Sequence, residues 1–232
     1  MTYLVKVTVI NGSPRRQKGY TGFILKPFIN GMKKAGGTVN VYYPSEMKIK
    51  PCIGNLDCWE SGNKECIIND EMQEMYSILR ETDILALASP VYIPLPSKMQ
   101  IFINRLCALL NPKTKFIEGR TRVSFRENVK ISKILGLITG GWWEIENLDT
   151  VLTIFKEFAK IASVEFIGAI LRPHTWLLKE NTQKNKEILD KIESLGKQVI
   201  KSGQMDKKDL DFVSQPLTTE PELRKMLNKI HS

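Results

Sequence analysis

The sequence lacks the features that would mark a membrane protein, a secreted protein or a histidine-dependent hydrolase. No stretch of about 18 uninterrupted apolar residues occurs, so no membrane span is expected. The N-terminus reads as a strand, not as a charged segment followed by an apolar signal sequence, and we therefore expect a cytoplasmic protein. The chain holds two histidines and no Ser-His-Asp arrangement, which argues against catalysis driven by histidine. We accordingly assign no catalytic side chain.

A concentrated basic motif is also missing, although the chain is basic overall. Its 34 Lys and Arg residues exceed its 25 Asp and Glu residues and give a net charge of +9. These cations are spread along the chain, with no basic helix and no interleaved aromatic motif, so we expect no nucleic-acid partner. The distribution indicates solvated faces together with a general attraction for phosphorylated small molecules.

Cysteine is scarce, and its few residues are unevenly distributed. Of four cysteines, Cys52, Cys58 and Cys66 lie within one loop, and Cys107 lies apart. In a cytosolic chain such a cluster suggests metal or redox chemistry before disulfides. Zinc is disfavoured because it prefers closer cysteine pairs with a fourth ligand, and both histidines are remote in sequence.

The most informative stretch that is present leads from a strand through a small loop into a helix. Residues 4–10 are apolar and β-branched at nearly every position, which is typical of a strand buried on both faces. The strand breaks at residues 11–14, where Gly12 can take backbone angles closed to other residues and Pro14 ends ladder pairing.

This arrangement predicts an anion site. The first amides of a helix have no partner within the helix, and the helix dipole favours negative charge at that end. Ser13 and Thr21 add hydroxyl donors, while Arg15 and Lys18 add positive charge. We therefore interpret the loop as a phosphate cradle; the alternative is an ordinary turn with a solvated basic edge.

Two missing motifs narrow the kind of phosphate. The absence of G-x-x-x-x-G-K-[ST] argues against a nucleoside triphosphatase, and the absence of G-x-G-x-x-G argues against the usual dinucleotide fingerprint. A mononucleotide remains, and flavin mononucleotide (FMN) is the leading candidate.

Apolar stretches alternate with helical patterns along the rest of the chain. The predicted strands are 4–10, 38–43, 83–89, 131–139 and 164–171. Alternation of this kind predicts a parallel sheet covered on both faces. Five strands fit a flavodoxin-like doubly wound sheet of order 2-1-3-4-5, with its ligand at the carboxyl ends of the strands. Three loops would then converge there: 11–21, 90–97 and 139–143.

Several local expectations accompany this architecture. Pro27 should kink the first helix, or else that helix starts later than Tyr20. Ser97 is expected to cap a helix, and residues 111–128 are expected to form a connecting excursion that serves as a lid or an interface arm. We predict an FMN-binding domain at 1–204 and a C-terminal helical tail at 205–232. Helices are expected at 181–202 and 222–230.

A family resemblance rests on short motifs in the three loops. They are Gly12-Ser13-Pro14-Arg15, Gly19, Thr21, Ser89-Pro90-Val91-Tyr92 and Thr139-Gly140-Gly141. Together they resemble the flavodoxin-like NAD(P)H-dependent FMN reductases. Lys18 is added to the residues that the resemblance implies because its positive charge lies in the predicted phosphate loop. The expected FMN contacts are Ser13, Arg15, Lys18, Gly19, Tyr20, Thr21, Pro90, Val91, Tyr92, Ile93, Thr139, Gly140, Gly141 and Trp142.

The cysteine loop resembles one branch of that family, the iron–sulfur flavoproteins. That branch carries four closely spaced cysteines, whereas Asn55 stands here at the position of the second. A [4Fe–4S] cluster normally takes four thiolates, and only Cys52, Cys58 and Cys66 remain as candidate ligands in the loop. Cys107 is expected to lie on a helix, where it would be a poor replacement for the missing fourth cysteine. We therefore expect bound FMN and no stable cluster; the alternative is a [4Fe–4S] cluster held by the three cysteines and an unusual fourth ligand such as Asp57.

The resemblance implies an FMN-dependent oxidoreductase that passes electrons from NAD(P)H to a small-molecule or protein acceptor. An electron carrier that takes no hydride is the first alternative, and a binding module that has lost the cofactor is the second. We expect a homodimer or homotetramer, with contacts from residues 111–128, Trp142, Trp143 and the tail.

Overall fold

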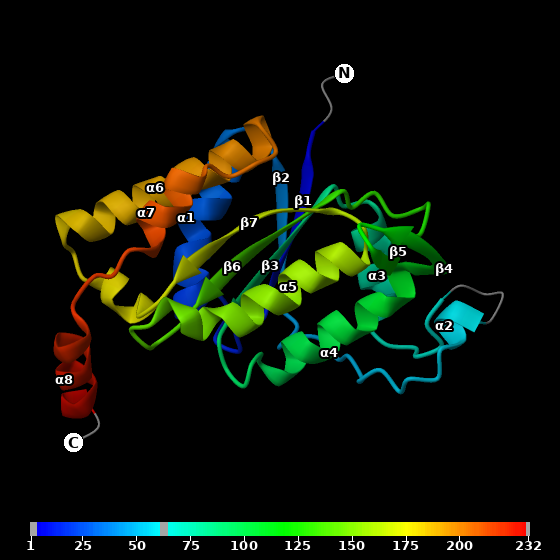
Figure 1. Ribbon diagram of the computed structural model, residues 1–232, viewed down its shortest axis with the longest axis horizontal. Helices are drawn as coiled ribbons and strands as arrows, with labels where there is room; N and C mark the ends of the chain where they lie inside the picture. The colour runs from blue at the N-terminus through cyan, green and yellow to red at the C-terminus, as the bar shows by residue number, and fades with distance from the viewer. Residues whose placement is uncertain (1–3, 61–64, 231–232) are drawn as a thin grey trace.

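The computed structural model describes residues 4–60 and 65–230 of the chain. Within these ranges a parallel five-stranded sheet runs in the order β2-β1-β3-β6-β7 (Figure 1). The strands are β1 (Lys6–Asn11), β2 (Thr38–Tyr42), β3 (Ile84–Pro90), β6 (Lys133–Thr139) and β7 (Glu165–Arg172). Because β6 and β7 are the fourth and fifth strands of this sheet, the predicted flavodoxin-like order 2-1-3-4-5 is confirmed.

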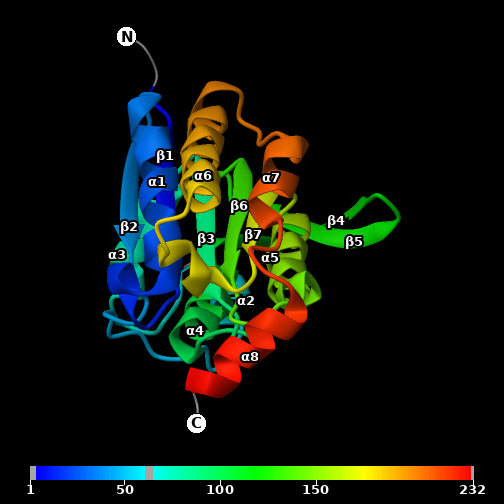
Figure 2. The same cartoon turned by 90° about the vertical axis from the view of Figure 1, so that its left-hand side faces the viewer.

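Helices cover both faces of the sheet (Figures 1 and 2). One face carries α1 (Tyr20–Lys34), α6 (Gln183–Lys201) and α7 (Lys207–Ser214), and the other carries α3 (Met72–Arg80), α4 (Ser97–Arg105) and α5 (Asp149–Ile161). The side chains of β3 alternate between two apolar cores: Leu85 and Leu87 enter the core under α3 to α5, and Ala86 and Ala88 enter the core under α1 and α6. A strand buried on both faces explains why its sequence is apolar throughout.

Shorter elements link these layers. They are η1 (Arg16–Lys18), α2 (Asp57–Glu60), η2 (Leu106–Leu109), η3 (Ile145–Leu148) and η4 (Thr175–Lys179). Residues 61–64 of the predicted cysteine loop lie outside the described ranges.

Two expectations about helix ends need revision. Helix α1 begins at Tyr20 and continues through Pro27, so the later start is wrong. Pro96 occupies the N-cap position of α4 and makes no side-chain cap bond, so the expectation that Ser97 caps this helix is also wrong. Proline is compatible with that position because it has no amide hydrogen to leave unpaired.

The excursion at 111–128 contains two strands that its sequence did not predict. Strands β4 (Leu110–Ile117) and β5 (Arg120–Phe125) form an antiparallel hairpin, and Figure 2 shows it projecting from the body. Both turn residues, Glu118 (φ 50°) and Gly119 (φ 76°), are left-handed, as tight hairpin turns require. Most of β4 is exposed on both faces, so its sequence lacks the alternation of apolar and polar residues that predicts a strand.

The C-terminal residues form α7, which was not predicted, and α8 (Glu220–Ile230), which was. Helix α7 packs against β7 and buries Val213, whereas Leu223 is the buried residue of α8. The division of the chain at residue 204 stays a prediction. None of the helices in the described ranges combines the length and the apolar character that a bilayer crossing requires.

Candidate functional site

Three loops meet where the central strands end. The amide of Gly12 donates to the carbonyl of Ala88 at 2.8 Å, which joins the ends of β1 and β3. The amide of Val91 donates to the carbonyl of Thr139 at 2.8 Å, which joins the ends of β3 and β6. The hydroxyls of Thr21 and Thr139 lie 2.8 Å apart and are buried. The predicted loops therefore lie side by side at the carboxyl edge of the sheet.

The first loop is shaped by Asn11, a residue that the sequence argument did not single out. Its buried side chain accepts a hydrogen bond from the amide of Ser13 at 3.0 Å and donates to the carbonyl of Arg16 at 3.4 Å. Arg16 has a left-handed backbone, with φ 53°. A polar side chain at the end of an apolar strand is the signal that could have identified this position.

The loop packs closely against the start of α1. Gly19 is the N-cap residue of α1, and a Cβ atom added there would lie 2.7 Å from Oγ of Ser13. A Cβ at Gly22 would lie 2.5 Å from the carbonyl oxygen of Arg16. Because these two glycines have no side chain, the hydroxyl of Ser13 lies beside the first amides of the helix. Hydroxyls and helix amides in this arrangement suit the oxygens of a phosphate monoester.

The predicted cations take no fixed place in this cradle. Arg15 and Lys18 are exposed, and Arg16 forms a surface ion pair with Glu46. The ring of Tyr20 faces Lys179, whose Nζ lies 4.7 Å from the ring centroid. These residues surround the cradle with positive charge, which attracts an anion from solution without holding it in one geometry.

The other two loops offer apolar surface beside the cradle. Pro90 and Val91 are half-buried, whereas Ile93 is 99% exposed and Trp142 is 64% exposed. A Cβ at Gly141 would meet nothing within 4 Å, so the backbone there borders open space. Exposed apolar side chains beside an accessible backbone can accept a flat aromatic ring.

The chain at the end of β7 supports Gly140 and Trp142 through backbone hydrogen bonds, and no motif in the sequence indicated this. The amide of Gly140 donates to the carbonyl of Arg172 at 3.0 Å, and the amide of His174 donates to the carbonyl of Trp142 at 3.1 Å. The amide of Thr175 donates to the carbonyl of Gly140 at 3.0 Å. The conformation of the third loop therefore depends on the chain after β7.

Arg172 and His174 form a buried polar pair under this loop. The guanidinium of Arg172 donates to the carbonyl of Val213 at 2.6 Å, and burial lowers its pKa to about 10. Nε2 of His174 accepts from the amide of Leu217 at 2.9 Å and lies 3.1 Å from a guanidinium nitrogen of Arg172. These contacts attach the chain after α7 to the carboxyl edge of the sheet.

Burial and the charge of Arg172 lower the pKa of His174 from 6.5 to about 4. Protonation would also turn Nε2 from an acceptor into a donor, and it would then face two other donors, the guanidinium of Arg172 and the amide of Leu217. The stability that neutral His174 contributes is therefore complete above pH 6.5 and is lost as the pH falls toward about 4. The loss should amount to roughly 2–3 kcal/mol of unfolding free energy. Urea denaturation across this range should show a shallower pH slope for His174→Gln; an unchanged slope would contradict the assignment.

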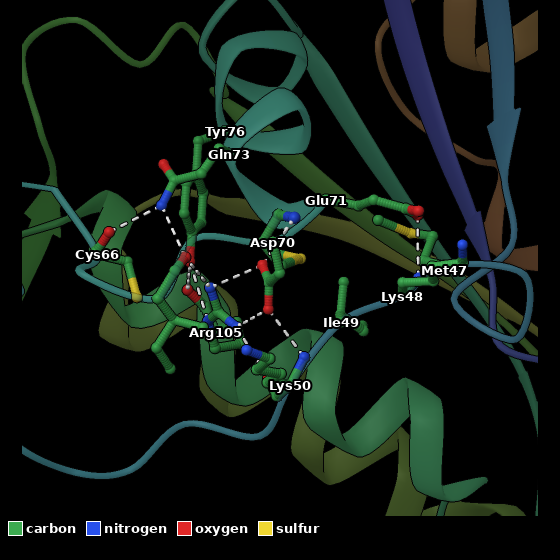
Figure 3. A network of polar contacts seen from close by, with 12 residues as sticks. Met47, Lys48, Ile49, Lys50, Cys66, Asp70, Glu71, Gln73, Tyr76 and Arg105 are labelled. Carbon is green, nitrogen blue, oxygen red and sulfur yellow. Dashed lines mark hydrogen bonds and ion pairs between the residues drawn. The ribbon is translucent and has the colours of Figure 1, made fainter.

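The cysteine loop lies elsewhere and is closed at its base by a buried ion pair (Figure 3). The guanidinium of Arg105 and the carboxylate of Asp70 lie 2.7 Å apart, with side chains 1% and 3% exposed. Arg105 also donates to the carbonyls of Lys50 and Ile68, and the amide of Lys50 donates to Asp70 at 2.8 Å. The two ends of the segment 50–68 are thus held side by side.

The described residues do not fit an iron–sulfur cluster. No three His, Cys, Asp or Glu side chains of residues 4–60 and 65–230 are placed to hold a metal ion. Asn55 hydrogen-bonds to the carboxylate of Asp57. Cys107 lies in the short helix η2, apart from the cysteine loop in the sequence.

Solved structures share this fold at low sequence identity. An NAD(P)H:quinone oxidoreductase from Methanothermobacter marburgensis matches with a TM-score of 0.58 and 16% identity, covering 85% of this chain and 98% of that one. A putative quinone reductase from Klebsiella pneumoniae matches with a TM-score of 0.62 and 14% identity, covering 87% and 86%. At such identities the likeness concerns the fold alone.

Curated relatives are closer in sequence but match over a shorter length. An iron-sulfur flavoprotein of Archaeoglobus fulgidus is 33% identical over 103 residues, which cover 44% of this chain and 46% of the relative. An iron-sulfur flavoprotein of Methanocaldococcus jannaschii is 31% identical over 117 residues, covering 50% and 58%. The chain therefore spans about half the length of the curated relatives that it matches.

The family model described as NADPH-dependent FMN reductase matches residues 5–121, a range that includes the cradle, the second loop and the cysteine loop. The chain belongs to the NADPH-dependent FMN reductase family.

Proposed function

We propose that the chain binds FMN at the three strand-end loops and passes electrons from NAD(P)H through it to a small-molecule or protein acceptor. The observation that carries the proposal is the cradle, in which Ser13, Thr21 and the start of α1 lie together beside the closely packed Gly19. Membership of the family supports the cofactor. A structure from Bacillus anthracis with the same fold, at 13% identity and a TM-score of 0.55, is described as an azoreductase in complex with FMN.

In this proposal the protein binds and orients, and the cofactor carries out the redox chemistry. FMN supplies reversible one- and two-electron transfer when it is bound. The hydroxyls of Ser13 and Thr21 and the first amides of α1 would hold the phosphate. Val91 and Gly140 would lie along the flavin ring, and Trp142 would limit access of water. No side chain is assigned a proton-transfer step.

The visible spectrum of the purified protein tests the proposal directly. Flavin bands should be present, or should develop when FMN is added, and they should bleach when NADH or NADPH is supplied. Bands that form but do not bleach with either nicotinamide would favour the electron carrier. A colourless protein that takes up no FMN would overturn the proposal and favour the binding module.

Replacing Ser13 by Ala removes one donor to the phosphate. Hydrogen bonds to charged groups contribute roughly 1.5–3 kcal/mol, so the Kd for FMN should rise about 10- to 100-fold. Fluorescence titration of the apoprotein measures the change. Ser77→Ala, at an exposed position of α3, is the matched control and should leave the Kd unchanged. Equal affinities for both variants would remove Ser13 from the site.

We also propose that the protein is a homodimer or homotetramer. Large apolar side chains are exposed near the strand-end loops and on the hairpin, among them Trp142, Ile93 and Phe116. Large apolar side chains are often exposed where they are covered by contacts between subunits. Sedimentation at micromolar concentration should give a multiple of the chain mass, and a monomer would contradict the proposal.

A further inference from the structure

Helix α2 of the cysteine loop is docked on the chain that follows α4. Nε1 of Trp59 donates to the carbonyl of Cys107 at 3.0 Å. Arg126 bridges the two segments, because its Nε donates to the carbonyl of Ala108 at 3.0 Å and a terminal nitrogen donates to the carbonyl of Cys58 at 2.5 Å. The backbones of Cys58 and Cys107 are therefore each held by a side-chain hydrogen bond.

This docking brings together two cysteines that are far apart in the sequence. The thiols of Cys58 and Cys107 lie close enough for each to shift the pKa of the other, and all four cysteines are free. Cys58 and Trp59 pack against the apolar core that includes Leu106 and Leu109. The segment that carries Cys58 is thus held at its base by Arg105 and Asp70, and beside η2 by Trp59 and Arg126.

We propose that Cys58 and Cys107 form a reversible dithiol–disulfide site, which fastens the cysteine loop to η2 when a low-molecular-weight disulfide oxidises it. Glutathione-type disulfides are the oxidant, and the corresponding thiols are the reductant. The site takes the place of the four-cysteine motif that Asn55 interrupts. It does not depend on the proposed FMN chemistry.

The exchange balances in two steps. The thiolate of Cys58 attacks one sulfur of the small disulfide, a mixed disulfide forms, and the other sulfur leaves as a thiolate that takes up a proton. The thiolate of Cys107 then attacks the sulfur of Cys58 and releases the second small thiol. The protein has lost two electrons and two protons, and one small disulfide has become two thiols.

Cys58 is the better first nucleophile of the pair. Burial raises the pKa of both thiols, and it raises that of Cys107 to about 12.

The site lies at the opposite end of α4 from the strand-end loops. Helix α4 runs for nine residues from Ser97 to Arg105, and η2 follows it. At about 1.5 Å per residue the helix separates the two regions by roughly 13 Å. Oxidation should therefore leave FMN binding intact, and the two proposals can fail independently.

The test is oxidation of the reduced full-length protein by oxidised glutathione at about pH 8, where thiol–disulfide exchange proceeds. Two of the four thiols should be lost, the mass should fall by about 2 Da, and peptide mapping should link Cys58 to Cys107. The cross-linked protein should melt roughly 5 °C or more above the reduced form, because the bond closes a long segment.

Two variants sharpen the result. Cys107→Ser should trap glutathione on Cys58 as a mixed disulfide, because the thiol proposed to resolve it has been removed. Cys52→Ser, the matched control in the same loop, should cross-link as the parent does. The proposal is overturned if no internal disulfide forms, or if the link involves Cys52 or Cys66. It is equally overturned if anaerobic reconstitution loads iron onto these cysteines. Peptide mapping of the oxidised protein without substitutions tests the Cys58–Cys107 link even if a variant fails to fold.

Discussion

Replacement of Asp70 by Asn is expected to lower the free energy of unfolding by about 3–5 kcal/mol, because it leaves the buried guanidinium of Arg105 without a counter-charge. Arg105 is 1% exposed and Asp70 is 3% exposed, so water cannot compensate for the loss. The carboxylate also accepts hydrogen bonds from the amides of Lys50 and Met72. One substitution therefore disturbs the base of the cysteine loop and the start of α3 together (Figure 3).

Urea denaturation measures this change, and an exposed ion pair is the control. Lys207 and Asp211 form a pair in which the side chains are 85% and 63% exposed, so Lys207→Ala should alter stability by less than about 1 kcal/mol. Arg105→Met should destabilise as strongly as Asp70→Asn, and the double variant should cost less than the sum of the two. Additive losses would show that the two residues act separately.

The same pair gives the protein a defined sensitivity to acid. Burial by itself raises the pKa of Asp70, but the hydrogen bonds from Arg105, Lys50 and Met72 outweigh it and hold the pKa below its usual value of 3.8. The stability that ionised Asp70 contributes is therefore present above pH 3.8 and is lost as the pH falls through its lower folded-state pKa. Asp70→Asn should lack this part of the acid response.

Replacement of Gly19 by Val is expected to weaken FMN binding at least about 100-fold, because several charge-assisted hydrogen bonds to the phosphate would be lost together. Its Cβ would lie 2.7 Å from Oγ of Ser13 and 3.0 Å from Cβ of Arg15, so the new side chain would fill the cradle. Gly19 precedes α1 and lies outside the apolar cores, so the fold itself should survive.

Flavin titration of the apoprotein, together with thermal unfolding, separates these effects. Lys33→Val places the same side chain on the exposed far end of α1 and should leave the Kd unchanged. The cradle would be in the wrong place if Gly19→Val retained parental affinity. A Tm that collapses in Gly19→Val alone would show that Gly19 serves packing instead.

Much of the fold was predictable because strands and helices depend on local periodicity. The apolar run in β3 predicted a strand buried on both faces, and the positions of its neighbours along the chain predicted the order of the sheet. The hairpin of β4 and β5 escaped this reasoning because most side chains of β4 are exposed. In β5 only Val123 and Phe125 are buried, which is too short an apolar alternation to mark a strand. The register of the hairpin is set by hydrogen bonds between backbone groups. Every residue except proline carries the same backbone groups, so residue type predicts this register poorly.

The sequence by itself determined the parallel architecture, the small polar loop after β1 and the incomplete cysteine motif, because each depends on residues that are neighbours in the chain. Only the tertiary structure decided which distant groups meet. Thr21 reaches Thr139, Asp70 neutralises Arg105, and Cys107 approaches Cys58. Contacts of this kind depend on how helices pack across the sheet, and packing sums many weak interactions that no single stretch of sequence contains.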